Sequence, residues 1–251
     1  MTSELQSLLE LPSRWMNQAG TLGYSPTHSQ VVSGSIFVTN PISFRPRTPS
    51  ADRDVIAYPG GFLLHSGLAN SGWKAVRKKY TSHWAQYRLP VWIHLICQDT
   101  AELERIVREC EETEGIAAIE LGLPPGCPQD FMLQLIHHAQ GEIPLIVHLS
   151  AGENHHLLNN LPPEVSAITL GSPRGRMKSE EGKIISGRLH GPGLFPLMLE
   201  HLNSLCGLGI PVILGGICNR EDGETALHTG AAAVQMDRLC WMGELPVSST
   251  S

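Results

Sequence analysis

Three residues with chemically useful side chains lie late in short apolar runs of this sequence. His94 ends the run VWIH, Glu120 ends IAAIE, and His148 ends LIVH. If each run is a strand of one parallel barrel, side chains that face inward near the strand ends converge at one mouth. Two imidazoles and a carboxylate there could bind a metal ion, or a histidine could pair with the carboxylate inside the core. We expect the second arrangement and no metal site.

A glycine pair, Gly215 and Gly216, follows another short apolar run, 210–214. Glycine has no Cβ, so its backbone N–H can approach an anion closely, next to the positive end of the following helix. Asn219 is placed to cap that helix and Gly230 to end it. In a (β/α)8 barrel the phosphate site lies after strands seven and eight. The same dipeptide would also suit a tight strand-to-helix turn.

The elements that must position these residues alternate along the chain as short buried strands and helices. After a short first strand near Trp15, we expect strands at 34–38, 91–97, 116–121, 143–149, 165–170, 210–214 and 231–236. The segment 39–61 is rich in proline and arginine and predicts a long loop. The alternation predicts one α/β domain, residues 1–251, folded as a (β/α)8 TIM barrel whose final helix is shortened or missing.

The bulk properties exclude several classes of protein. A net charge of −6 offers no basic footprint for nucleic acid, and no run of apolar residues is long enough to span a membrane. The six cysteines are scattered without a C-x-x-C pair, which argues against a zinc knuckle or a redox dithiol. We expect a cytoplasmic protein with a small-molecule substrate, no nucleic-acid partner and no membrane association.

Five segments together resemble the catalytic barrel of the dihydroorotate dehydrogenase family, which binds flavin mononucleotide (FMN). They are AGTLGY and SGLANSG in the first part of the chain, and GRLHGPGL, IPVILGGI and GAAAVQM in the last quarter. The resemblance implies that the FMN phosphate rests on Gly215 and Gly216. It also implies backbone contacts to the flavin at Ala19, Gly20 and Gly191.

The same resemblance assigns side chains, with departures from the family pattern. Asn70 would hydrogen-bond the substrate, although an asparagine at this place also suits a helix cap. Thr39 replaces one flavin-binding lysine of the family, and His148 replaces another. An imidazolium at His148 would stabilise negative charge on reduced flavin. Cys127 lies about two positions beyond the place of the family's catalytic base, so it would serve only if its loop is re-formed.

Three further residues flank the expected mouth. Ser172 keeps a small hydroxyl next to a position where the family has a flavin-binding asparagine. Arg174, in an expected loop, could grip a substrate carboxylate or phosphate. Asp237 is unfavourable beside a phosphate unless Arg238 turns inward to offset it.

These residues favour a divergent FMN-dependent oxidoreductase that transfers hydride between flavin and a small planar or anionic substrate other than dihydroorotate. His148 and Cys127 are the candidate catalytic side chains. One alternative is a barrel that has lost catalysis and binds a phosphorylated ligand or serves as a subunit of another enzyme. A second is a metal-dependent lyase or hydrolase that uses His94, Glu120 and His148. A second copy or a partner subunit would cover the C-terminal end, where the final helix is expected to be short.

Overall fold

Eight parallel strands form the centre of the molecule. The computed structural model describes residues 13–25, 36–50, 54–153, 155–158 and 160–237. The strands are β1 (Trp15–Asn17), β2 (Phe37–Val38), β5 (Val91–Ile96), β6 (Ile116–Gly122), β7 (Leu145–Ser150), β8 (Val165–Gly171), β11 (Val212–Ile217) and β12 (Ala233–Met236). Their order is β1-β12-β11-β8-β7-β6-β5-β2, and the bridge from Met16 to Ile36 joins the two edge strands. The predicted (β/α)8 barrel is confirmed.

The barrel closes between its two shortest strands, and a side chain completes the closure. The Asn17 amide donates to the carbonyl of Val38 over 2.7 Å, and its oxygen accepts the Val38 N–H over 2.8 Å. An asparagine side chain thus replaces a pair of backbone hydrogen bonds. Because β2 has only two residues, this contact fixes where β1 and β2 end.

Residues that alternate along the strands fill the barrel in layers, since successive side chains of a strand point to opposite faces. One apolar layer contains Trp92, Ala118, Ile146, Ala167, Ile213 and Ala233. Two residues further along the same strands come His94, Glu120, His148, Thr169, Gly215 and Gln235. The barrel interior therefore changes from apolar to polar within one step toward the C-terminal mouth.

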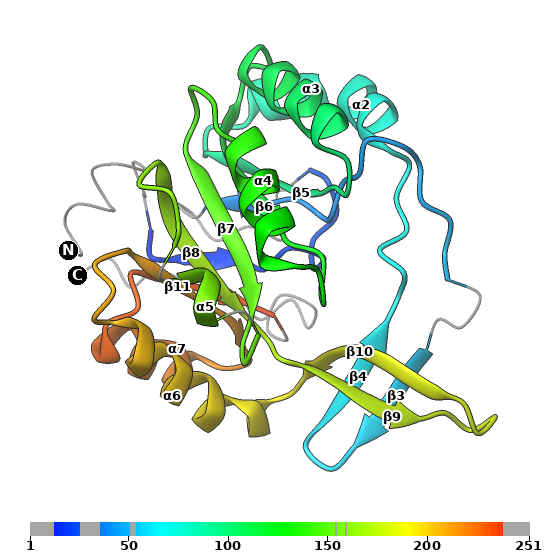
Figure 1. Ribbon diagram of the computed structural model, residues 1–251, viewed down its shortest axis with the longest axis vertical. Helices are drawn as coiled ribbons and strands as arrows, with labels where there is room; N and C mark the ends of the chain where they lie inside the picture. The colour runs from blue at the N-terminus through cyan, green and yellow to red at the C-terminus, as the bar shows by residue number, and fades with distance from the viewer. Residues whose placement is uncertain (1–12, 26–35, 51–53, 154, 159, 238–251) are drawn as a thin grey trace.

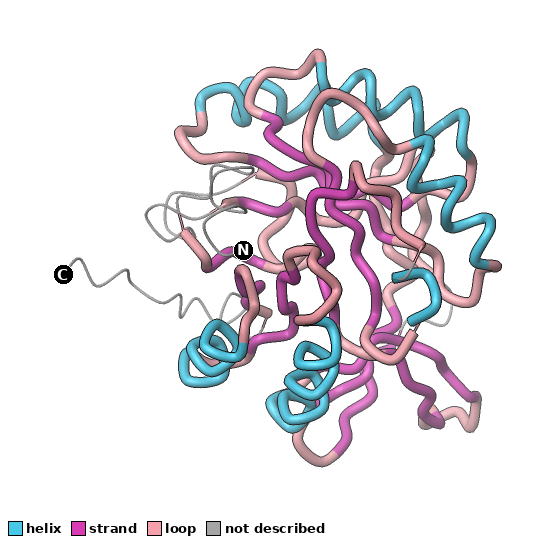
Figure 2. Tube along the Cα trace, turned by 60° about the vertical axis from the view of Figure 1, so that its left-hand side comes forward, coloured by secondary structure: helices cyan, strands magenta, loops and turns pink. Residues whose placement is uncertain are grey.

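Helices cover the outside of the barrel (Figures 1 and 2). One apolar cluster packs β5, β6 and β7 against α2 (Trp73–Gln86), α3 (Thr100–Glu111) and α4 (Gln129–His138). A second cluster packs β8, β11 and β12 against α6 (Phe195–Leu205) and α7 (Arg220–Thr229). The short α5 (His155–Leu158) follows β7, and the 3-10 helix η1 (Pro192–Leu194) precedes α6. Asp99 and Asn219 accept backbone N–H groups at the starts of α3 and α7, so the helix start predicted at Asn219 is confirmed.

A second, antiparallel sheet projects beyond the C-terminal ends of the barrel strands (Figure 1). Its order is β3 (Asp54–Tyr58), β4 (Gly61–His65), β10 (Ile184–His190) and β9 (Arg174–Lys178). The prediction of a loop throughout 39–61 was therefore wrong, because residues 54–58 pair with β4. The loop expected around Arg174 is also a strand. β3 pairs with β4 and β9 pairs with β10 in two local hairpins, but the hairpins form one sheet through the pairing of β4 with β10, more than a hundred residues apart, which local sequence does not reveal.

The remaining expectations concern the final helix, membrane spans, the number of domains and the location of the protein. The shortened or missing final helix falls within residues 238–251, which lie outside the described residues. No helix within the described ranges is long and apolar enough to span a bilayer. The single domain over 1–251 and the cytoplasmic location stay predictions.

Candidate functional site

Glu120 is the centre of the polar layer and is completely buried. One carboxylate oxygen lies 2.6 Å from His94 Nδ1. The other accepts hydrogen bonds from the Thr169 hydroxyl at 2.6 Å and the Gln235 amide at 2.7 Å. Burial raises the pKa of Glu120, but the His94 hydrogen bond and charge, with the Thr169 hydrogen bond, outweigh it and lower the pKa to about 2. Glu120 is therefore a buried carboxylate ion that organises four strands.

His148 lies beside this network without joining it. Its ring packs edge-on against His94 with centroids 5.3 Å apart, and its Nε2 is buried with no hydrogen-bond partner among the described residues. Burial, followed by the positive charge of Arg188, lowers the pKa of His148 to about 3. The expected imidazolium is therefore absent at neutral pH. A neutral ring with an unpartnered Nε2 costs about 1–3 kcal/mol.

Because Gly171 and Gly122 have no side chains, the rings of His148 and His94 have room beside them. A Cβ on Gly171 would lie 2.5 Å from His148 Nε2, and a Cβ on Gly122 would lie 2.8 Å from His94 Nε2. Each glycine lies two residues after a member of the polar layer, Gly171 after Thr169 on β8 and Gly122 after Glu120 on β6. The absence of a side chain at Gly122 makes room for the His94 ring. Imidazole edges, rather than longer side chains, therefore line this part of the mouth.

The metal alternative receives no support from this geometry. Both oxygens of Glu120 are engaged by protein donors. Within the described ranges, no group of three or more His, Cys, Asp or Glu side chains is arranged to hold a metal ion. The pairing of His94 with Glu120 is the arrangement we expected.

The glycine pair on β11 lies at the same mouth. Gly216 has a φ of 77°, and the ladder to β12 is irregular between Leu214 and Ile217, so the strand bends at this point. A Cβ on Gly216 would lie 2.5 Å from Ser172 Oγ, so the Ser172 hydroxyl lies against the glycine pair. The Gly216 N–H donates to Gln18 Oε1 over 2.8 Å. The protein's own Gln18 thus binds an amide that the resemblance assigns to phosphate.

Asp237, which follows β12, is also engaged. Its carboxylate pairs with Nδ1 of His190, and the His190 ring stacks on Phe62 with centroids 4.9 Å apart. Asp237 is thereby partly offset by a side chain of the second sheet. Arg238, the cation we expected to provide this offset, lies outside the described residues. Sequence reasoning missed His190 because β10 itself was missed.

Arg188 on β10 is the second functional residue that sequence reasoning missed. It is half-buried, and its charge acts on Asp237, Glu120 and His148. Burial lowers the pKa of Arg188, but a guanidinium remains charged. Arg174, the predicted substrate-binding residue, is its direct partner across the β9–β10 ladder. The mouth therefore has a cationic side formed by the second sheet.

Asn70 is used within its own loop. Its oxygen accepts the N–H groups of Gly72 at 2.9 Å and Ser43 at 3.2 Å, and its nitrogen donates to Leu68 O and Ser43 Oγ, each at 3.0 Å. These bonds shape the turn that leads into α2. The N-cap of α2 is Gly72, without a side-chain cap hydrogen bond, so Asn70 stabilises the turn before the helix and does not cap it. Substrate binding by Asn70 stays a prediction.

The remaining predicted flavin contacts lie at strand ends. Thr39 is fully buried, and its hydroxyl accepts the His94 N–H at 3.0 Å. Ala19 and Gly20 form the turn after β1, and Gly20 has a φ of 91°. Gly191 follows β10 and has a φ of 141°. Their roles toward flavin stay predictions.

Cys127 lies apart from this constellation. Its side chain is partly buried against the apolar cluster outside the barrel, which includes Met132 of α4. No contact with His148 is found in the described part of the chain. The structure does not bring the two candidate catalytic side chains together.

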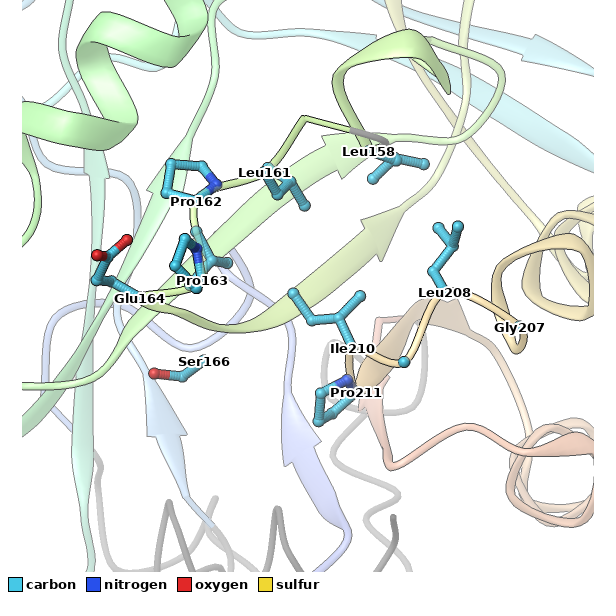
Figure 3. Close-up of a pocket in the computed structure, with 12 residues that line it drawn as sticks. Leu158, Leu161, Pro162, Pro163, Glu164, Ser166, Gly207, Leu208, Ile210 and Pro211 are labelled. Atoms are coloured by element: carbon cyan, nitrogen blue, oxygen red, sulfur yellow. The ribbon is translucent and has the colours of Figure 1, made fainter.

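An open groove lies at the other end of the strands (Figure 3). It is lined at the N-terminal ends of β8 and β11, and its walls include Leu161, Leu208 and Ile210. Active sites of (β/α)8 barrels lie at the C-terminal ends of the strands, so the groove is not the candidate site.

Comparison with known proteins gives relatives of one kind. No family model matches the chain. Over 263 aligned positions the chain is 25% identical to the catalytic subunit of dihydroorotate dehydrogenase B (NAD(+)) from Pelobacter propionicus, covering 91% of this chain and 84% of the relative. The corresponding subunit from Trichlorobacter lovleyi is 26% identical, with 94% of this chain and 86% of the relative covered.

A solved structure supports the fold. A mutant of FabK from Thermotoga maritima superposes with a TM-score of 0.55 at 15% identity. The match covers 94% of this chain but 64% of the FabK chain, so this chain spans less than two thirds of that protein. At this identity the likeness concerns the barrel alone.

Proposed function

Because the chain is a divergent relative of the dihydroorotate dehydrogenase B catalytic subunits, we propose that it is an FMN-dependent oxidoreductase. The substrate is a small molecule bound at the C-terminal mouth of the barrel. The observation that carries the proposal is His148 Nε2, a buried polar atom without a partner among the described residues. Such an atom is stabilised when a ligand supplies the missing hydrogen bond.

The residues present fit the ring of a flavin. His148 provides a neutral nitrogen at the mouth, and the Arg188 guanidinium provides a lasting positive charge that acts on the same place. We assign to Arg188 the electrostatic role that the family pattern gives to a lysine at position 148. When bound, FMN would supply hydride transfer, and the protein would supply position and charge.

The glycine pair can accept the phosphate of FMN once Gln18 moves away from the Gly216 N–H. Gly216 has no side chain to obstruct an anion, and Ser172 adds a hydroxyl beside it. Its N–H becomes available only when Gln18 releases it. Asp237 remains paired to His190, which limits its repulsion of a phosphate.

The contacts of Gln18 and Asp237 favour one alternative, a barrel that no longer binds flavin and serves as a subunit of another protein. Gln18 on Gly216 and the carboxylate of Asp237 both reduce the affinity for a phosphate.

Flavin binding separates the two functions. We expect FMN fluorescence to be quenched with saturation near one equivalent, and riboflavin to bind more weakly because it lacks the phosphate. Arg188→Gln should reduce FMN affinity by about tenfold, whereas the exposed control Lys74→Gln should leave it unchanged. No saturable quenching by FMN or riboflavin would refute the proposal and leave the alternative.

A further inference from the structure

The second sheet presents a row of cations on the face that meets the barrel mouth. Arg188 and Arg174 are directly paired across β10 and β9, so their side chains share one face. Arg176 and Lys178 follow at alternate positions of β9 and therefore lie on that face too. We call Arg174, Arg176, Lys178 and Arg188 the cationic row.

The row runs from the mouth outward. Its inner member, Arg188, is half-buried and acts on Glu120 and His148 inside the barrel. Arg174 is also half-buried, whereas Arg176 and Lys178 are exposed. At about 3.3 Å per strand residue, positions 174 to 178 span about 13 Å.

The carboxylates of Asp237, Glu120 and Glu153 offset part of the charge of Arg188, but Arg174 repels it. Like charges placed directly opposite each other on two strands destabilise a sheet. None of the four side chains makes an ion pair or hydrogen bond with another described residue. The whole chain, in contrast, carries a net charge of −6. Four cations gathered on one face against this overall charge indicate an anionic ligand.

We propose that the cationic row binds an extended small-molecule polyanion with two or more phosphate groups, one at the mouth and the others along β9. The proposal deepens the proposed function, because it places this ligand next to the flavin, although the row itself does not require flavin. Arginine suits phosphate because its planar guanidinium donates two parallel hydrogen bonds. A small molecule is favoured over an acidic protein because the row begins at a half-buried arginine.

Apolar residues on the same face indicate the rest of the ligand. Leu64 is paired with both Val55 and Arg188, and Ile184 is paired with Lys178. Val55 is 67% exposed and Ile184 is 65% exposed. The ligand therefore fits best if an apolar portion lies beside its phosphates.

The test uses inorganic tripolyphosphate and orthophosphate as probes on the full-length protein, with calorimetry at low salt. We expect tripolyphosphate to bind at least tenfold more tightly than orthophosphate. The double variant Arg176→Gln/Lys178→Gln should weaken tripolyphosphate about tenfold and leave orthophosphate nearly unchanged. The control Lys74→Gln/Lys78→Gln removes the same charge from the exposed face of α2 and should change neither.

Three results would overturn the inference. In the first, tripolyphosphate does not bind. In the second, both double variants weaken tripolyphosphate binding equally. In the third, poly-L-glutamate binds in place of tripolyphosphate and the double variant in the row weakens it, which would make the row a docking surface for acidic protein. FMN titration of the same samples separates the two proposals. Tripolyphosphate binding without FMN binding refutes only the proposed function, and FMN binding without tripolyphosphate binding refutes only the cationic row.

Discussion

Two adjacent layers inside the same barrel differ in how completely their side chains are satisfied. The lower layer consists of apolar residues such as Trp92 and Ile146, which are fully buried. The upper layer lies two residues further along the strands and holds a buried carboxylate ion, Glu120. Two of its atoms, His148 Nε2 and Gln235 Oε1, lack partners in the described part of the chain. The lower layer stabilises the fold, and the upper one retains unmet hydrogen-bonding capacity that a ligand can use.

The largest effect should come from removing the centre of the upper layer. Glu120→Ala leaves the donors of His94, Thr169 and Gln235 unpaired in the core, so we expect a loss of about 3–5 kcal/mol in the free energy of unfolding. Urea denaturation measures it. The exposed Glu200→Gln should cost less than about 0.5 kcal/mol. A comparable loss in both variants would mean that the network does not carry this stability.

Acid should weaken the upper layer in two steps. The folded pKa of His148, about 3, lies below its ordinary 6.5, so unfolding takes up one proton between these values and stability falls as pH falls. The slope is about 1.4 kcal/mol per pH unit. Glu120, with a folded pKa of about 2 against 4.5, adds a further loss between pH 4.5 and 2.

A variant isolates the histidine step. His148→Gln should remove about one proton from the uptake between pH 6.5 and 3, measured by urea denaturation across that range. The exposed His83→Gln should preserve the full slope. An unchanged slope in His148→Gln would show that His148 is not held neutral.

Filling the space above the histidines should affect both folding and binding. Gly171→Ala places a Cβ 2.5 Å from His148 Nε2 and must displace the ring. We expect about 1–3 kcal/mol of destabilisation and at least about a tenfold loss of FMN affinity, which corresponds to 1.4 kcal/mol or more. Gly207→Ala meets no atom within 4 Å and serves as the matched control. Unchanged FMN affinity in Gly171→Ala would remove His148 from the flavin site.

The smallest effect concerns Gln18. Gln18→Ala frees the Gly216 N–H at a cost of about 1 kcal/mol. FMN affinity should rise a few-fold while riboflavin affinity stays the same, because only FMN carries the phosphate. A fall in FMN affinity, seen by fluorescence titration, would show that Gln18 helps to bind the phosphate.

The barrel was predictable because its signals are local. The apolar run at 210–214, the Asn219 cap and the Gly230 stop each depend on a few neighbouring residues, and the structure confirms the strand and helix they indicate. The pairing of His94 with Glu120 followed from their late positions in adjacent strands.

The second sheet was not predictable in the same way. Residues 54–58 and 174–178 pair with the neighbouring strands β4 and β10, but the two hairpins join only through the long-range pairing of β4 with β10, which their own composition does not indicate. Arg188 and His190 were missed for this reason. The neutral state of His148 was also hidden, since it depends on burial and on the charge of Arg188.

The state of the His148 ring can be observed directly by nitrogen-15 NMR of the full-length protein before and after addition of FMN. We expect a neutral imidazole at pH 7 whose Nε2 resonance moves on FMN binding, while the resonances of the His94 ring, already paired with Glu120, move less. A protonated His148, or an Nε2 resonance that stays unchanged in a protein saturated with FMN, would show that His148 does not lie at a flavin site as a neutral acceptor.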